Sequence, residues 1–194
     1  HKRAYEGDRG PNTGGMGTYS DVNHGLPFLS NDNISDAKTI NTATAKAIKA
    51  KFGEGYRGVL YGGFMATASG VKLIEYNARL GDPEAINVLS LLESDFIDIC
   101  LAIADGSLGQ VDVRFANKAT VCKYAVPEGY PGNPVKGRGI DVSGVSNQDG
   151  LFYASVDIKE GQLVESGSRT IAVVGVADTL AEAESVAEKE ISTV

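Results

Sequence analysis

A strand-turn-strand pattern that leads directly into a helix start is the feature that most constrains how this chain folds. Residues 56–66 and 71–77 are rich in strand-forming side chains, and residues 68–70 between them are typical of a turn. Asp82 then suits a helix cap, and Pro83 suits the first helical position after it. The pattern predicts an antiparallel strand pair packed against helices, and therefore an α+β fold.

The rest of the chain divides, on composition, near residue 108. Before that point we predict a long ordered loop over residues 1–32 and two helices: residues 36–52, capped by Ser35 or Asp36 and ended by Gly53, and residues 96–104, begun at Ser94 and closed by Gly106. After it we predict strands at residues 119–126, 150–156 and 170–176, a loop at residues 128–134, and a last helix opened by a capping-box pattern at Thr179. We therefore expect two domains, residues 1–108 and a small β-rich domain with a terminal helix at residues 109–194.

Charge and composition exclude several classes of protein. The 194 residues are 42% apolar and 22% charged, a balance that predicts a packed core. The net charge of -7 argues against a broad nucleic-acid-binding surface, and no apolar run is long enough for a transmembrane helix. We expect no signal peptide, and we expect Cys100 and Cys122 to be buried, reduced thiols, which favours a cytoplasmic location.

The segment from residue 73 to residue 79 carries the most informative polar pattern. Strand side chains alternate between faces, so Glu75 and Asn77 point to the same side, and Arg79 joins them if the strand persists. A carboxylate beside an amide oxygen suits Mg²⁺, and a guanidinium nearby can bind a phosphate or carboxylate in bidentate fashion. The same pattern also fits a solvated strand face, and spacing alone does not separate the two.

Residues 10–17, with the sequence Gly-Pro-Asn-Thr-Gly-Gly-Met-Gly, form a second candidate site. Successive small residues let backbone N–H groups approach a ligand and bind an anion, although a simple turn cluster would have the same composition. Asp82 and Glu84 could pass for a carboxylate pair, but capping and dipole matching at a helix start explain them more simply. His1 and His24 have no metal-ligand partner at useful spacing, and we expect no chemical role for them.

Taken together, these segments closely resemble the phosphoribosylamine–glycine ligase (glycinamide ribonucleotide synthetase) family of the ATP-grasp superfamily. The resemblance covers nearly the whole chain in order and spacing, and it rests on residues 1–3, 10–17 with Tyr19 and Ser20, 58–65, 75–84 and 129–132. Each motif alone is weak, whereas the combination is specific.

The resemblance implies an enzyme of purine biosynthesis that uses ATP and Mg²⁺ (or Mn²⁺). ATP phosphorylates glycine to glycyl phosphate, and the amine of 5-phosphoribosylamine displaces the phosphate to give glycinamide ribonucleotide, ADP and phosphate. Glu75 and Asn77 match the family's metal-ligand positions, and Arg79 matches an arginine that steadies the transferring phosphoryl group. The loop of Asn12, Thr13, Gly14, Gly15, Met16 and Gly17 matches the segment that lines the substrate side of the cleft.

Two departures from the family pattern bear on activity. Gly63 stands where ATP-grasp enzymes commonly place another metal-binding polar side chain, so that ligand is replaced by water or the second metal is held differently. The chain also matches only the later half of the ATP-grasp unit and the C-terminal domain. The expected partners are therefore the small-molecule substrates and the N-terminal region of the same enzyme, which this sequence does not include. We expect little or no ligase activity from the chain alone.

Other functions remain open on the sequence. The chain could be a non-catalytic binding or assembly module derived from an ATP-grasp enzyme, or one subunit of a split enzyme. A carboxylase-type ATP-grasp protein would keep the fold and change the substrate, but the pairing of residues 10–17 with residues 79–84 resembles the glycine ligase most.

Overall fold

The computed structural model describes all 194 residues, which form two compact units that interleave along the chain. The first, which we call the sheet unit, comprises residues 1–24, 82–91 and 117–194. The second, which we call the hairpin unit, comprises residues 25–81 and 92–116.

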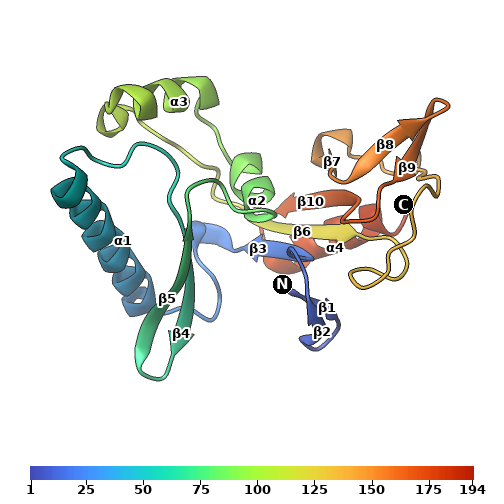
Figure 1. The fold of residues 1–194 in the computed structure, drawn as a ribbon, viewed down its shortest axis with the longest axis horizontal. Coiled ribbons are helices and arrows are strands. Elements are labelled where there is room, and N and C mark those ends of the chain that lie inside the picture. Colours follow the sequence, from blue (N-terminus) through green and yellow to red (C-terminus); the bar gives the residue numbers. More distant parts are fainter. The chain divides into compact units, whose positions relative to one another are not determined.

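A four-stranded antiparallel sheet organises the sheet unit (Figure 1). Its strand order is β3 (Gly17–Ser20), β6 (Ala119–Ala125), β10 (Ile171–Ala177) and β7 (Leu151–Tyr153). Strand β10 pairs with β6 along its whole length, from Ile171 opposite Ala125 to Ala177 opposite Ala119. The two central strands, β6 and β10, carry mostly buried apolar side chains, as expected for a sheet that is covered on both faces.

Alternation along β10 assigns each face of the sheet to one helix. Ile171 and Val173 are fully buried in a cluster that includes Ile191 of α4 (Leu180–Ile191), and a side chain at Gly175 would collide with the α4 backbone. The intervening positions, Ala172 and Val174, pack in a second cluster, which contains Ile86 of α2 (Glu84–Ser90). The sheet is therefore a central layer between α4 and α2.

Shorter elements complete the sheet unit. They are two hairpins and two 3-10 turns: β1 (Arg3–Tyr5) with β2 (Arg9–Asn12), β8 (Val156–Lys159) with β9 (Gln162–Glu165), η1 (Val22–His24) and η3 (Gln148–Gly150). The buried Glu190 carboxylate of α4 accepts hydrogen bonds from the backbone N–H groups of Ser146 and Asn147, so it ties the loop before η3 to the helix.

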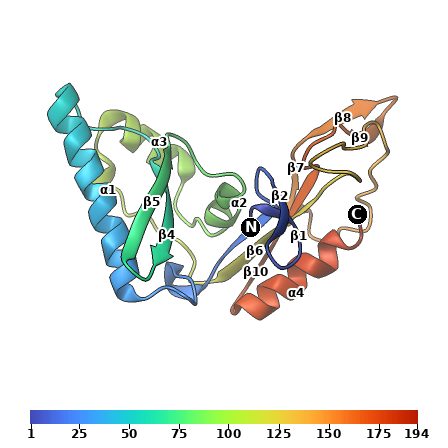
Figure 2. The same ribbon diagram turned by 60° about the horizontal axis from the view of Figure 1, so that its bottom comes forward.

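The hairpin unit consists of a long helix, a two-stranded sheet and a short helical segment. Helix α1 (Asn31–Phe52) lies alongside the hairpin of β4 (Tyr61–Thr67) and β5 (Gly70–Asn77), as Figure 2 shows. Helix α3 (Phe96–Asp105) and the turn η2 (Leu108–Gln110) follow. Ile99 and Ala102 are the only buried apolar side chains in this unit, and α1 has no buried residue.

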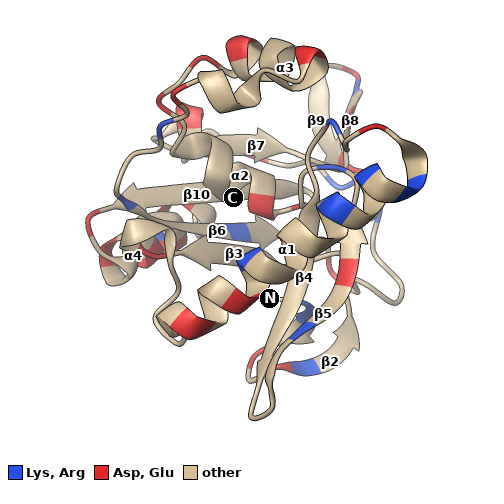
Figure 3. Cartoon of the chain, turned by 90° about the vertical axis from the view of Figure 1, so that its left-hand side faces the viewer, with Lys and Arg blue, Asp and Glu red and all other residues tan.

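The charges of α1 follow the helix dipole. Asp32 lies in its first turn, and Lys49 and Lys51 lie in its last turn, where the helix ends favour these signs (Figure 3). Ser30 caps the helix through a capping box with Asn33, and Gly53 ends it in the left-handed conformation. The helix therefore begins five residues before the predicted start at residue 36, with Ser30 as its cap in place of Ser35 or Asp36.

The predicted α+β class is confirmed, and several details of the prediction are wrong. Residues 1–32 are not a long loop, because they form β1, β2, β3, η1 and the start of α1. Pro83 occupies the cap position of α2 and makes no side-chain cap bond, and α3 is capped by Asp95 rather than begun at Ser94. The hairpin β8–β9 has no counterpart in the predicted strands.

Two further predictions concern domains and cysteines. The compact units are each built from separate segments of the chain, whereas the predicted domains, residues 1–108 and 109–194, are consecutive. The predicted domain boundary near residue 108 stays a prediction. Cys122 is buried, and burial raises the pKa of its thiol to about 12, whereas Cys100 is exposed on α3, contrary to prediction. None of the helices combines the length and the hydropathy needed to cross a bilayer.

Candidate functional site

The predicted polar stripe lies at the C-terminal end of β5. The pairing of Gly63 with Glu75, Gly62 with Tyr76 and Tyr61 with Asn77 is regular, so Glu75 and Asn77 share one face of the hairpin. Tyr76 lies on the other face, where its hydroxyl contacts Asn41 and Thr44 of α1. The stripe therefore points away from α1.

The structure limits this stripe to two residues. A register shift between Gly63 and Phe64 interrupts the alternation before Glu75, so Leu73 does not share the face of Glu75 and Asn77. Strand β5 ends at Asn77, and Arg79 is in the turn beyond it, where its guanidinium donates to the carbonyl oxygen of Leu80 at 2.8 Å. Arg79 therefore does not extend the strand face of Glu75 and Asn77. Its role at the phosphoryl group stays a prediction.

The donor set of the stripe fits Mg²⁺. Glu75 supplies a carboxylate and Asn77 an amide oxygen, the hard ligands that this ion prefers. Gly63 lies directly opposite Glu75, and even an added Cβ there would lie 3.6 Å from Glu75 Cγ, at ordinary contact distance. No group of three or more His, Cys, Asp and Glu side chains gathers anywhere in the chain, which is compatible with an ion that keeps most of its water and phosphate ligands.

The predicted substrate loop, residues 12–17, belongs to the sheet unit and connects β2 to β3. Most of its backbone donors already have partners in the protein. The N–H of Thr13 binds Lys2 O, that of Gly15 binds Thr13 Oγ1, and that of Met16 binds His1 O. The N–H of Gly14 makes a long contact of 3.5 Å with the Tyr130 hydroxyl. The loop is therefore less free to bind an anion through successive N–H groups than its composition suggested, and its substrate role stays a prediction.

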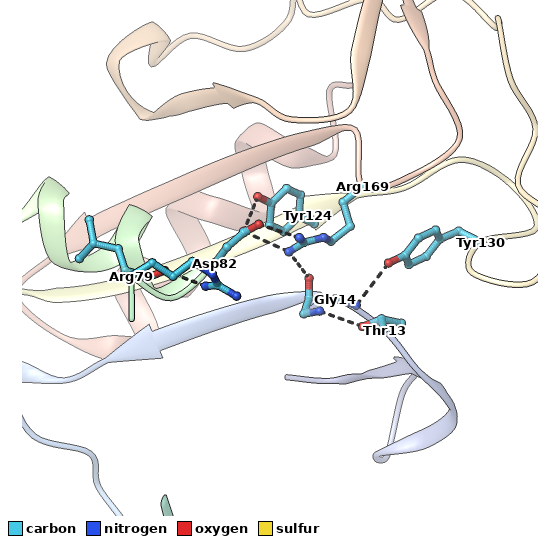
Figure 4. A network of polar contacts seen from close by, with 9 residues as sticks. Thr13, Gly14, Arg79, Asp82, Tyr124, Tyr130 and Arg169 are labelled. Atoms are coloured by element: carbon cyan, nitrogen blue, oxygen red, sulfur yellow. Dashed lines mark hydrogen bonds and ion pairs between the residues drawn. The ribbon is translucent and has the colours of Figure 1, made fainter. Parts of the chain in front are cut away.

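Beside this loop lies a cluster of Arg169, Asp82 and Tyr124, which we call the anchor cluster (Figure 4). Arg169 donates to both carboxylate oxygens of Asp82, at 2.7 and 3.1 Å, and to the carbonyl oxygen of Gly15 at 3.1 Å. The Tyr124 hydroxyl donates to Asp82 at 3.1 Å, and the guanidinium lies 4.7 Å from the centre of the Tyr124 ring. The side chain of Arg169 is only 16% exposed.

Electrostatics in the anchor cluster follow from this packing. Burial raises the pKa of Tyr124, and the charge of Asp82 raises it further. Burial alone would lower the pKa of Arg169, but hydrogen bonds and charge from Asp82 raise it above its usual value. Both effects keep Tyr124 neutral and Arg169 charged at physiological pH.

Sequence reasoning missed Arg169 and misassigned Asp82. Capping was the simpler explanation for Asp82, whereas its carboxylate in fact binds a guanidinium 87 positions away. No local spacing connects these residues, because the contact exists only once α2, which follows Asp82, packs on the sheet that contains β10. Gly14 and Gly15 lie close to this arginine: a Cβ on Gly14 would lie 3.2 Å from its guanidinium carbon, so a side chain there would displace the guanidinium by a few tenths of an ångström.

Two family profiles match the chain. Residues 1–85 match the phosphoribosylglycinamide synthetase ATP-grasp (A) domain, and residues 120–194 match the C domain of the same synthetase. Together they cover most of the sequence.

Individual relatives agree with these matches. The phosphoribosylamine–glycine ligase of Methanosarcina barkeri is 53% identical over 98% of the chain, and that of Methanocaldococcus jannaschii is 53% identical over 97%. The chain spans only 44% and 43% of their lengths, respectively.

Solved structures place the fold in the same group. The crystal structure of phosphoribosylamine–glycine ligase from Thermotoga maritima matches 98% of the chain and 46% of its own, with a TM-score of 0.82 and 33% identity. Phosphoribosylglycinamide synthetase from Anaerococcus prevotii matches with a TM-score of 0.61 at 15% identity, which supports the fold alone.

Proposed function

Because the chain belongs to the phosphoribosylglycinamide synthetase family, we propose that it is the metal-bearing part of an ATP-dependent carbon–nitrogen ligase of purine biosynthesis. The reaction joins glycine to 5-phosphoribosylamine through glycyl phosphate and yields glycinamide ribonucleotide, ADP and phosphate. The single observation that carries this proposal is the placement of Glu75 and Asn77 on one face of β5, opposite the face that contacts α1.

The proposed chemistry begins with the poor reactivity of a carboxylate. Its charge repels nucleophiles and its oxygen is a poor leaving group, so phosphorylation by ATP supplies the leaving group that amide formation needs. Phosphoryl transfer depends mainly on positioning and on neutralising charge. A bound Mg²⁺ or Mn²⁺ would supply part of that neutralisation at the phosphates of ATP.

Residues of this chain would position and neutralise those phosphates. Glu75 and Asn77 would hold the divalent ion through one carboxylate and one amide oxygen. Arg79 would move from the carbonyl of Leu80, which it now binds, to an oxygen of the transferring phosphoryl group or of glycyl phosphate. Gly63 leaves room beside Glu75 for a water ligand, which would replace the side chain that related enzymes carry there.

The loop of residues 12–17 would line the substrate side of the cleft. The Gly14 N–H is the loop donor least committed inside the protein, because its contact with Tyr130 is long. It is therefore the backbone group most able to turn to an anionic substrate or intermediate. Asn12 is exposed and could contribute its side chain to the same ligand.

We also propose that the chain needs a partner and works in the cytoplasm. The curated relatives are more than twice as long as this chain, and the remainder would supply the ATP-holding lobe and the phosphoribosylamine site. Two free cysteines, with no disulfide between them, suit a reducing compartment.

The test is an assay of ADP and glycinamide ribonucleotide formation from ATP, glycine and 5-phosphoribosylamine. The chain alone should show little turnover, and the complete polypeptide or the chain with its missing region should form both products in equal amounts. ADP release that does not require glycine would contradict the proposed reaction. Robust turnover by the 194-residue chain alone would contradict its dependence on a partner.

A further inference from the structure

We propose that Arg169 is a positioning residue, which fixes the backbone of Gly14 and Gly15 and thereby shapes the substrate loop of residues 12–17. It acts through the loop and does not contact the reacting atoms. The role of the loop rests on the proposed function, whereas the ordering of the loop by Arg169 does not.

The first support is the set of contacts made by the guanidinium. Its Nη1 atom binds Gly15 O and one oxygen of Asp82, and its Nη2 atom binds the other oxygen of Asp82. One planar group thus joins the loop to Asp82, two residues before α2, and its fork geometry fixes both partners at once. Most of the Arg169 side chain is shielded from solvent, whereas the Asp82 side chain is 54% exposed, so water reaches the pair mainly from the Asp82 side.

The second support is the fit between Arg169 and the two glycines. The guanidinium lies so close to Gly14 that an added Cβ would be 3.2 Å from three of its atoms. Gly15 has a φ of +111°, and an added Cβ would lie 2.8 Å from Pro83. The loop backbone therefore packs closely against both Arg169 and Pro83, with no side chain of its own in the contact.

The third support is that the other members of the anchor cluster hold Arg169 in place. Tyr124 supplies a ring against the guanidinium and a hydroxyl that binds the same Asp82 carboxylate. The backbone of Arg169 is fixed as well, because its carbonyl oxygen accepts from the N–H of Ser155 at 2.8 Å. Although Asp82 is partly exposed, these contacts hold the guanidinium at several points at once, which orders it more than a single exposed ion pair would.

The first experiment measures amide hydrogen exchange in the 194-residue chain carrying Arg169→Lys. Lysine keeps the charge but cannot reach Gly15 O and both oxygens of Asp82 together. We expect the amides of residues 14–16 to exchange at least about tenfold faster, while those of β6 and β10 change less than about twofold. Arg138→Lys is the matched control, because Arg138 is an exposed arginine paired with Glu128 elsewhere in the same unit, and it should leave residues 14–16 unchanged.

Asp82→Asn provides a second variant if Arg169→Lys does not fold. It keeps the shape of the side chain and removes the charge that holds the guanidinium, so the same local increase in exchange is expected. Unchanged exchange at residues 14–16 in the folded variants would overturn the proposal. An equal increase in β6 and β10 would also overturn it, because Arg169 would then support the whole unit rather than the loop.

The second experiment uses the complete enzyme with Arg169→Lys. We expect the KM for glycine or for 5-phosphoribosylamine to rise about tenfold, with the KM for ATP within about twofold of wild type. A uniform loss of kcat with all three KM values unchanged would contradict a positioning role. If the wild-type enzyme forms no glycinamide ribonucleotide, the proposed function fails, and the exchange experiment still decides the role of Arg169.

Discussion

The two compact units differ most in how much apolar surface they bury. In the sheet unit, two clusters fill both faces of a four-stranded sheet, and Ile171, Ala172 and Val173 have no exposed surface. In the hairpin unit, a two-stranded sheet lies against a helix that has no buried residue. Met65 and Ile74 of its hairpin are more than half exposed.

This difference separates a unit that can stabilise itself from one that needs additional contacts. A two-stranded hairpin is marginal in water unless it packs on a substantial apolar surface, and most helix stability comes from tertiary packing. The proposed metal ligands lie on the less buried unit, whereas the anchor cluster lies on the well-packed one. We therefore expect the metal stripe to be ordered mainly by contacts that the rest of the enzyme supplies, and the substrate loop to be ordered by this chain.

The largest effect is expected from Gly175→Ala in β10. The new Cβ would lie 2.0 Å from the carbonyl oxygen of Ala183 and 2.8 Å from the backbone nitrogen of Ala187, so α4 would have to move off the sheet. We expect a loss of about 3 kcal/mol or more in the free energy of unfolding, measured by urea denaturation. Gly63→Ala in the hairpin unit is the control, because its Cβ meets only ordinary contacts; a similar loss there would break the comparison.

The second-largest effect is expected from truncating apolar side chains, which should lower stability in the sheet unit much more than in the hairpin unit. Ile171→Ala leaves a cavity in a fully buried position and should cost about 2–5 kcal/mol. Ile74→Ala removes a side chain that is 63% exposed and should change stability by less than about 0.5 kcal/mol. Both values come from the same urea titration, and equal costs would mean that the hairpin unit has a core that its exposure does not reveal.

A smaller, local effect is expected from Tyr76→Phe. The substitution removes the hydroxyl that contacts Asn41 and Thr44, the polar link between β5 and α1, and should cost about 1 kcal/mol. Faster amide exchange should be confined to α1 and the hairpin. Tyr153→Phe, at an exposed tyrosine of β7, is the control and should leave exchange in the hairpin unit unchanged. Faster exchange in β6 or β10 after Tyr76→Phe would argue that the two units unfold together.

The smallest effect is a dependence on acidic pH confined to the sheet unit. A hydrogen bond from Lys123 lowers the pKa of Glu188, and hydrogen bonds from Ser146 and Asn147 lower that of Glu190. The contribution of these two carboxylates to folding stability is therefore complete above the ordinary glutamate pKa of about 4.3. It is lost as the pH falls through their lower pKa values in the folded state. The Tm should fall by a few degrees over this range, and Glu190→Gln should flatten the fall. An unchanged pH profile in that variant would remove Glu190 as its source.

Local signals in the sequence located many elements correctly. Gly53 and Gly106 end their helices in the left-handed conformation, and Thr179 caps α4, all as predicted. Such signals act within a few residues, so composition and spacing reveal them. The alternation of Glu75 and Asn77 was predicted for the same reason.

Contacts between distant segments could not be predicted in this way. Strand β3 was taken for a loop because its partner, β6, lies about a hundred residues later, and only that pairing makes residues 17–20 a strand. The register shift before Glu75 depends on how two strands pair, and the binding of Asp82 by Arg169 depends on the completed sheet. Local propensity contains no information about any of these.

Binding of Mn²⁺–ATP to the complete enzyme tests the central claim most directly, with Mn²⁺ observed by electron paramagnetic resonance. Glu75→Ala should weaken binding at least about tenfold, because it removes the one charged ligand of the stripe. Glu54→Ala, which removes an exposed carboxylate from the turn after α1, should leave it within about twofold of wild type. Unchanged binding by the Glu75 variant, or equal weakening by both, would contradict a metal site on this face of β5.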